Sequence, residues 1–511
     1  MSASELALVA ALAAALSAVA FLACARERVK TDEGYLWYGA LRTLDGEVPL
    51  RDFRSYEPGR YYWSALWMRA LGPGVLALRA AQHGFYFLGL ACGLAALRVS
   101  DVAWPAVIAA ALLLAAWAYP NHKLFEQAMA MAAVLAGTVL LAHPGAGTIL
   151  AAGALAGATS FFGLNYALYA GASLLGLTLL AAAKSGAIAT SGVLAAYLAG
   201  AAAGALPLLA LGALAPGLFG ALHERRVRQV LERGSTNLPR PVPWPWRPGT
   251  RSRAARWFIG IYFALLPAFG WSVVLWAVLA PWGAIEREAA LVASGFVGAT
   301  VLHHAFSRAD FRHLAQCMPP VILGSIALLG HGVGWALLGG LLGLGTLVTV
   351  IPAHPLARRL RHPSRYVQRN IAGMRVWIRR DDAKLIRALR PVVRRLERGE
   401  PLLALPTLAA LFPILGRRSA VYDNFCVYPA GESQQRAMLH SISEQGVRLA
   451  VVRDRPVDGR EELRFSRTHP AVWSYLVSEF VPLELCGLPD GYHVLWRPIH
   501  AETDLTHPYG G

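Results

Sequence analysis

The sequence predicts a polytopic α-helical membrane protein with a small α/β region near its C-terminus. Two features of the composition carry the first part of this prediction. Of the 511 residues, 56% are hydrophobic and only 15% are charged, and the mean hydropathy is +0.42, whereas soluble proteins carry about 25% charged residues. The apolar residues are also gathered in Ala/Leu/Gly/Val runs, many of them long enough to span about 30 Å of hydrocarbon.

Apolar runs predict about eleven transmembrane helices. They cover residues 5–25, 76–97, 102–119, 126–143, 146–163, 165–183, 187–214, 257–281, 288–306, 314–331 and 332–352. Several runs are rich in Ala and Gly, which lets helices pack closely in lipid. The polar regions are a first loop (26–75), a basic Pro/Trp loop (215–256) and the tail from 353. We therefore predict a transmembrane module over 1–352, a basic juxtamembrane linker over 353–400 and a small α/β domain over 401–511.

The first run predicts a retained helix, because it lacks a basic n-region and is longer than a signal-peptide core. With a cytoplasmic N-terminus and an odd number of spans, the first loop and the tail both lie outside. Charges in the short loops are balanced and do not decide the orientation. This topology also brings residues 120–126 and 307–314 to the outer face. The Ala/Arg-heavy composition indicates a bacterium, so we expect an active face toward the periplasm or exterior of the inner membrane.

The composition and the residue pattern of the tail change at Pro401. Residues 356–400 are dense in arginine and predict helices lying against head groups or against the first loop. Beyond them, short β-type runs alternate with helical ones, as in a small α/β domain. Cys426 and Cys486 share this segment, so one disulfide could form in an oxidising compartment.

The formal net charge of +17 would suit nucleic acid, anionic lipid head groups or a phosphate-bearing substrate. Because so much of the chain lies in lipid, we expect membrane lipids or a phosphate-bearing substrate and no nucleic acid. The loop 215–256 fits this view, since Trp244 and Trp246 stand between prolines as interfacial anchors do.

Asp32 and Glu33, which follow the first apolar run directly, are the strongest candidate for a site. An acidic pair at a helix exit is often only a solvated cap. Here an aromatic segment and several arginines follow, and Glu57-Pro58-Gly59 can turn the loop back. A carboxylate with guanidinium groups at a lipid–water boundary suits general-base attack on a phosphate-activated carbon.

The motifs in this loop resemble the first outer loop of the GT-C glycosyltransferases. They are Asp-Glu-Gly-x-Tyr, "LDGEVPLRDF" and "YEPGRYYW", and "ALRAAQ" follows them at the start of the next span. The nearest branch is the bacterial one related to protein O-mannosyltransferases and lipid A aminoarabinose transferases. "SRADFRHLAQCMPPVIL" is similar to the start of a late span in this group, and "LPTLAALFPILGRRSAVYD" resembles its small outer domain.

The resemblance implies a polyprenyl-phosphate sugar donor and inverting transfer to a hydroxyl of a glycan, lipid or protein. Asp32 would then be the general base and Glu33 its orienting partner. The candidate contacts to the donor phosphate are Arg54, Glu57, Arg60, His122, Lys123, Arg308, Asp310 and His313. Some relatives bind a divalent metal at the acidic site. The sequence has no clear set of hard-oxygen ligands, so the metal is left open.

Residues 119–127 allow two interpretations. His122 and Lys123 could anchor a short loop at the interface, or they could join the site. In the second case Glu126 would supply the acidic residue that the second outer loop of the family carries. Neighbouring His303 and His304 point about 100° apart on a helix, which favours packing or pore lining over a metal pair.

Two rival functions stay open at this point. A transporter or flippase of lipid-linked sugars would use the acidic pair for coupling, but transporters usually hold ionisable residues near the bilayer midplane on repeated halves. The sequence shows no such halves. A non-catalytic sensor with an outer ligand-binding domain would leave the chemistry of the first loop unexplained.

Overall fold

The computed structural model describes residues 1–29, 31–186, 192–233, 237–247, 251–329 and 335–498. The chain forms two compact units. Unit 1 contains Met1–Ala25, Glu57–Trp67 and Arg79–Arg361, and unit 2 contains Arg26–Tyr56, Met68–Leu78 and His362–Gly511. The predicted domain boundaries at 352 and 400 stay a prediction. The predicted start of the seventh span at 187 and the border between the last two at 331–332 lie outside the described residues.

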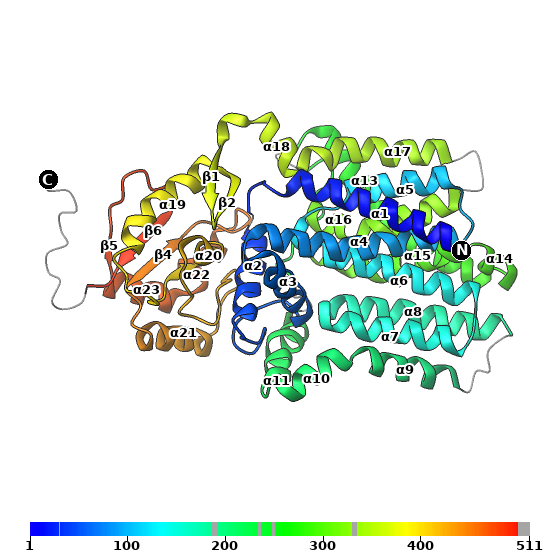
Figure 1. Ribbon diagram of the computed structural model, residues 1–511, viewed down its shortest axis with the longest axis horizontal. Coiled ribbons are helices and arrows are strands. Elements are labelled where there is room, and N and C mark those ends of the chain that lie inside the picture. Colours follow the sequence, from blue (N-terminus) through cyan, green and yellow to red (C-terminus); the bar gives the residue numbers. More distant parts are fainter. Residues whose placement is uncertain (30, 187–191, 234–236, 248–250, 330–334, 499–511) are drawn as a thin grey trace. The chain divides into compact units, whose positions relative to one another are not determined.

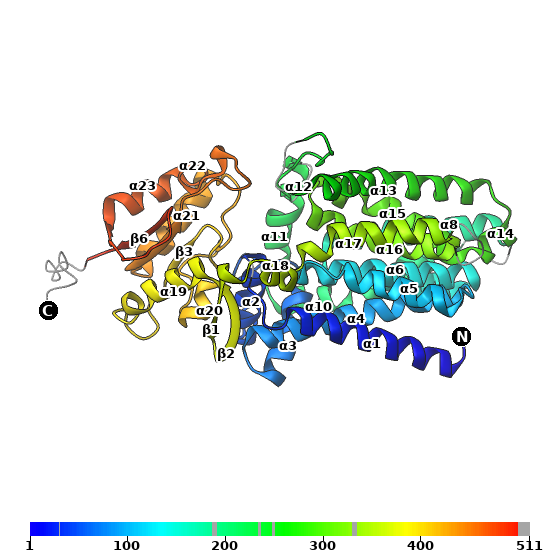
Figure 2. The ribbon, with the colours of Figure 1, turned by 90° about the horizontal axis from the view of Figure 1, so that it is seen from above.

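Unit 1 is a bundle of helices that lie side by side (Figures 1 and 2). Its longer helices are α1 (Ala3–Cys24), the first part of α3 (Pro58–Leu71), most of α4 (Val75–Val99), α5 (Trp104–Ala116), α6 (Leu124–Ala142), α7 (Ala146–Phe162), α8 (Leu164–Lys184), α9 (Val193–Gly204), α10 (Leu206–Leu214), α13 (Arg253–Leu279), α15 (Ala289–Ser307), α16 (Phe311–Leu329) and α17 (Trp335–Thr349). Short helices connect them: α11 (Leu218–Leu222), α12 (Arg228–Arg233), α14 (Trp282–Arg287) and α18 (Pro355–Arg361).

The chain is a multi-pass membrane protein, and each predicted apolar run contains a helix. Among the described residues, six helices are long and apolar enough to cross a membrane, or up to eight if each bent pair counts as one span. This is fewer than the eleven predicted spans. Helices α5 and α7 are apolar but have only 13 and 17 residues. Helix α16 has 19 residues, and its first two turns carry the polar Arg312, His313 and Gln316.

Small residues set the closest packing in unit 1. Gly153 and Gly157 of α7 lie against α9, and a Cβ atom on them would come within 2.1 and 2.0 Å of the carbonyl oxygens of Tyr197 and Ala201. Helix α9 presents its own glycines, Gly200 among them, to α7 in the same way. The two backbones approach this closely only because these positions carry no side chain.

Unit 2 is built on a four-stranded sheet with the order β3-β4-β6-β5. The strands are β3 (Leu403–Leu405), β4 (Leu449–Arg453), β5 (Val481–Pro482) and β6 (Tyr492–Trp496). Strands β3 and β4 are parallel, and β6 is antiparallel to both β4 and β5. The helices of this part are α20 (Leu411–Leu415), α21 (Glu432–Glu444), α22 (Phe465–Thr468) and α23 (Pro470–Glu479).

The sheet of unit 2 encloses a hydrophobic core. Its buried residues come from β3, β4 and β6 and from α21 and α23, including Leu405, Val452, Ile442 and Leu476. The small α/β region expected near the C-terminus is therefore present. Cys426 is buried, Cys486 is exposed, and both thiols are free.

The arginine-dense segment differs from its prediction, which was helical throughout. Its middle part is a hairpin of β1 (Tyr366–Ile371) and β2 (Met374–Arg379), and helix α19 (Arg380–Val393) follows. Ala372 and Gly373 have positive φ angles of 48° and 82°, which suit a two-residue hairpin turn. In β2 the buried Val376 and Ile378 alternate with the less buried Arg375, Trp377 and Arg379.

Candidate functional site

Asp32 and Glu33 lie in the first turn of a separate helix, α2 (Thr31–Leu44), in unit 2. Asp32 is half-buried and Glu33 is only 2% exposed. Carboxylates are favourable at this end of a helix because unpaired backbone N–H groups give it a partial positive charge. The aromatic residues that follow are buried, so α2 presents an acidic first turn on an apolar body.

Arg54, one of the predicted phosphate contacts, is bound by the carboxylate of Asp423, which is not among the residues predicted from the sequence. Its Nη1 lies 2.6 Å from Oδ2 of Asp423, and Asp423 also accepts a hydrogen bond of 2.8 Å from Gln434 Nε2. Burial works against the charge of Arg54, but the carboxylate of Asp423 outweighs it and raises the pKa of Arg54 above its usual value. No local pattern could have found this pair, since 369 residues separate its members.

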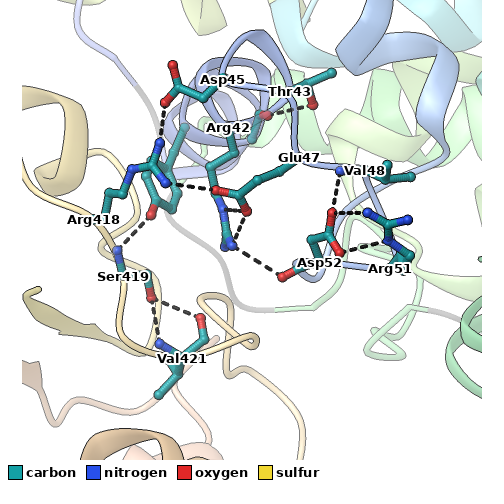
Figure 3. A network of polar contacts seen from close by, with 12 residues as sticks. Arg42, Thr43, Asp45, Glu47, Val48, Arg51, Asp52, Arg418, Ser419 and Val421 are labelled. Carbon is teal, nitrogen blue, oxygen red and sulfur yellow. Dashed lines mark hydrogen bonds and ion pairs between the residues drawn. The ribbon is translucent and has the colours of Figure 1, made fainter. Parts of the chain in front are cut away.

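The segment after α2 carries a second set of ion pairs, which Figure 3 shows. Arg418 reaches Asp45 at 2.6 Å and Glu47 at 3.2 Å. Glu47 also accepts a hydrogen bond of 2.6 Å from Arg42 Nε. The backbone N–H of Ser419 donates to the hydroxyl of Tyr38 at 2.7 Å. These contacts fix the end of α2 against residues 418–419.

Unit 1 contains a buried cluster around Glu126, at the start of α6. Arg60 Nη1 lies 2.8 Å and Lys123 Nζ 3.1 Å from the same carboxylate oxygen of Glu126. Arg60 is 3% exposed and Glu126 2%. Glu57, a further predicted site residue, lies 4.0 Å from Arg60. One carboxylate therefore holds two of the predicted phosphate contacts in place.

A second group surrounds Asp310, between α15 and α16. Arg308 Nε lies 3.0 Å from Asp310 Oδ2, and His313 Nδ1 lies 2.9 Å from Oδ1. The backbone N–H groups of Arg312 and His313 donate to Oδ1 as well, so Asp310 caps the first turn of α16. Burial favours the neutral acid, but the bonds from His313 and the charge of Arg308 outweigh it and lower the pKa of Asp310.

The neighbouring histidines of α15 have separate partners, as expected for packing residues. His303 Nδ1 lies 2.8 Å from the hydroxyl of Tyr169, and His304 Nε2 lies 2.8 Å from Oε1 of Gln316. The rings of His304 and His313 are 5.1 Å apart. Within the described ranges, no group of three or more His, Cys, Asp or Glu side chains could hold a metal ion.

Hydrogen bonds bring the clusters of unit 1 to one end of the bundle. Gln127 of α6 donates to the carbonyl of Ala315 in α16 at 2.8 Å. Tyr166 of α8 donates to the carbonyl of Gln316 at 3.3 Å. Helices α6, α8 and α16 thus begin at the same end. The predicted residues found there are Glu57, Arg60, the buried His122, Lys123, Arg308, Asp310 and His313. Asp32, Glu33 and Arg54 belong to unit 2.

Comparisons with known proteins identify the fold. No family model and no curated protein matches the sequence. The structure of ArnT from Cupriavidus metallidurans bound to undecaprenyl phosphate is similar, with a TM-score of 0.55 and 14% identity over 97% of this chain and 98% of that one. The apo structure of the same ArnT is similar as well, with a TM-score of 0.51 and 14% identity over 96% of this chain and 97% of that one. The oligosaccharyltransferase of Archaeoglobus fulgidus, in complex with Zn and sulfate, has a TM-score of only 0.43 and 12% identity over 86% of this chain and 67% of that one. The chain has the GT-C fold, as the sequence resemblance predicted.

Proposed function

We propose that this chain is an integral membrane glycosyltransferase that uses a polyprenyl-phosphate-linked sugar as its donor. The observation that supports this most is the GT-C fold shared with ArnT, which covers 97% of this chain and 98% of the ArnT chain. That ArnT structure contains undecaprenyl phosphate. Likeness over nearly the full length of both chains favours a shared type of reaction over an unrelated use of the helices.

Asp32 is the proposed general base. Its carboxylate takes the proton of the acceptor hydroxyl, and the acceptor oxygen attacks the anomeric carbon of the donor. The bond from that carbon to the phosphate oxygen breaks, and the polyprenyl phosphate leaves with the bonding electrons. Attack from the face opposite the leaving group inverts the anomeric carbon. Glu33, the buried neighbour of Asp32, orients the base.

Basic side chains of unit 1 are the proposed contacts of the donor phosphate. Arg60 and Lys123 are held by Glu126, and Arg308 and His313 are held by Asp310. Groups that are already held in position stabilise a departing phosphate without further reorganisation. In this proposal His122 joins them, while Glu57 and Asp310 orient cations and do not touch the donor. Arg54 belongs to unit 2 and is not among these side chains.

The proposed reaction takes place at the outer face of a bacterial inner membrane. The long apolar tail of the donor stays in the bilayer, and the acceptor approaches from water. The acceptor class and the sugar are what the following experiment identifies.

Mass spectrometry of the membrane lipids and envelope glycans of a strain that lacks this gene tests the function. We expect one sugar to be missing from a glycan, lipid or protein, and its polyprenyl-phosphate donor to accumulate on the outer face. Accumulation of the donor on the cytoplasmic face would instead support the flippase. Unchanged glycans and donors would contradict both.

A further inference from the structure

The first loop and the C-terminal α/β region share one unit, although about 350 residues lie between them. The two parts meet along one continuous strip, residues 410–425, which we call the platform strip, and Tyr428 adds a cation–π contact to Arg54. In the sequence, the platform strip follows β3 (Leu403–Leu405) after a short connection. Its residues Ala420 and Val421 are part of the hydrophobic core. The strip is thus attached firmly to the sheet.

The first turns of α2 rest on this strip. A Cβ atom on Gly34 would lie 2.5 Å from the Cβ of Ala410, so the helix touches the strip at the residue next to Glu33. The ring of Tyr35 lies 5.0 Å from that of Phe425, and the ring of Tyr38 lies 4.5 Å from that of Phe412. These contacts lie within one or two helical turns of Asp32.

The segment after α2 is held by the same strip. Arg54 pairs with Asp423 at 2.6 Å, and the backbone N–H of Arg54 donates to the carbonyl of Tyr422 at 3.0 Å. The hydroxyl of Tyr422 donates to the carbonyl of Leu50 at 2.6 Å. Leu50 has a positive φ of 70°, which is unfavourable for this residue type. The strip therefore helps to hold this backbone conformation, together with the loop's own hydrogen bond of 3.1 Å from the N–H of Leu50 to the carbonyl of Phe53.

We propose that the C-terminal α/β region is the platform that fixes α2, and that Asp423, acting through Arg54, is a positioning residue for Asp32. The role of Asp32 rests on the proposed function, whereas the platform rests on the contacts alone. In this proposal Arg54 attaches the first loop to the platform strip and does not contact the donor phosphate. Because the base must lie within hydrogen-bond reach of the acceptor hydroxyl, loosening α2 lowers the rate of transfer more than the affinity for donor.

Hydrogen exchange with mass spectrometry on the full-length protein tests the platform without relying on activity. In Asp423→Asn, we expect amides of residues 31–56 to exchange at least tenfold faster, while those of α8 keep their rate. Asp423→Glu retains the carboxylate and should restore most of the protection. Unchanged exchange over 31–56 in Asp423→Asn overturns the platform.

A milder set of variants covers the case in which Asp423→Asn does not fold. Tyr38→Phe and Tyr422→Phe each remove one hydroxyl that contacts the other segment. Tyr475→Phe makes the same change on α23, where the ring packs on the core. We expect faster exchange over 31–56 in the first two and wild-type exchange in the third. Equal exchange in all three overturns the proposal.

Steady-state kinetics then separate the platform from the proposed function. With a polyprenyl-phosphate sugar as donor, the loosened variants should show a kcat lowered at least tenfold and a donor KM within twofold of wild type. Faster exchange with unchanged kcat overturns the positioning role. If the wild-type protein itself transfers no sugar, the proposed function fails, and the exchange data still decide whether the platform exists.

Discussion

Arg60 and Glu126 form a buried ion pair with 2.8 Å between Nη1 and Oε1. Arg60 also donates to the carbonyl of Phe162, so the pair ties α3, α6 and the end of α7 together. Breaking a buried ion pair by removing one member costs about 3–5 kcal/mol, and the contact of 3.1 Å that Lys123 keeps with the same oxygen of Glu126 places Arg60→Met toward the lower end of that range. We expect Arg60→Met to lower the unfolding free energy by this amount, as measured by thermal unfolding in detergent.

The double variant Arg60→Met/Glu126→Leu is the matched control for this pair. It removes both charges and leaves apolar groups, which is often nearly neutral for a buried pair. Its melting temperature should therefore lie well above that of Arg60→Met. A double variant that is as unstable as the sum of the two single ones would show that the residues act independently.

The close approach of α7 and α9 predicts a large effect of a single methyl group. A Cβ at position 157 would lie 2.0 Å from the carbonyl oxygen of Ala201, so Gly157→Ala must push the helices apart. Overpacking of this kind costs about 1–3 kcal/mol, which a lower melting temperature would show. Gly171→Ala in α8 is the control, because a Cβ there meets nothing within 4 Å. Equal melting temperatures for the two variants would contradict the packing.

Because His469 is buried, we expect the free energy of unfolding of unit 2 to fall in mild acid. Its side chain is fully buried, and burial lowers its pKa from 6.5 to about 4. In the unfolded chain His469 therefore takes up a proton near pH 6.5, whereas in the folded protein it is protonated only near pH 4. Protonation then favours unfolding, and between pH 7.5 and pH 5 the loss is about 2 kcal/mol.

The opening free energy of amides in β4, measured by hydrogen exchange at both pH values, checks this expectation. His469→Gln removes the titrating group and should flatten the dependence on pH. The exposed His493 gives the control variant His493→Gln, which should keep the wild-type slope. A wild-type slope in His469→Gln would assign the acid sensitivity to other groups.

The overall architecture could be predicted because its signals are local. Apolar runs mark the helices, the change of texture at Pro401 marks the α/β region, and Asp32 stands directly after the first run. Among the described residues, six to eight helices are long and apolar enough to cross a membrane, compared with eleven predicted spans, and the apolar run around α5, for example, gives only 13 helical residues. The many arginines of this segment led to a helical prediction for the hairpin over 366–379. Gly373 and the alternation of buried and less buried residues in β2 are the local signals that favour a hairpin.

The partners of the candidate residues could not be predicted, because they come from distant segments. Asp423 binds Arg54 across 369 residues, and Glu126 binds Arg60 across 66. Nothing near Asp423 in the sequence distinguishes it from a solvated acid of a loop. Such pairs are set by the packing of elements, so only the structure shows which cations are already held by a carboxylate.

Transfer from a polyprenyl-phosphate sugar by purified Asp32→Asn tests the central claim most directly. A general base contributes about 10²–10⁴-fold to a rate, so we expect release of polyprenyl phosphate to fall by that factor while hydrogen exchange over α2 stays unchanged. Asp490→Asn makes the same substitution at a fully exposed loop residue and should keep the wild-type rate. Wild-type turnover in Asp32→Asn would contradict the assignment of Asp32 as the base.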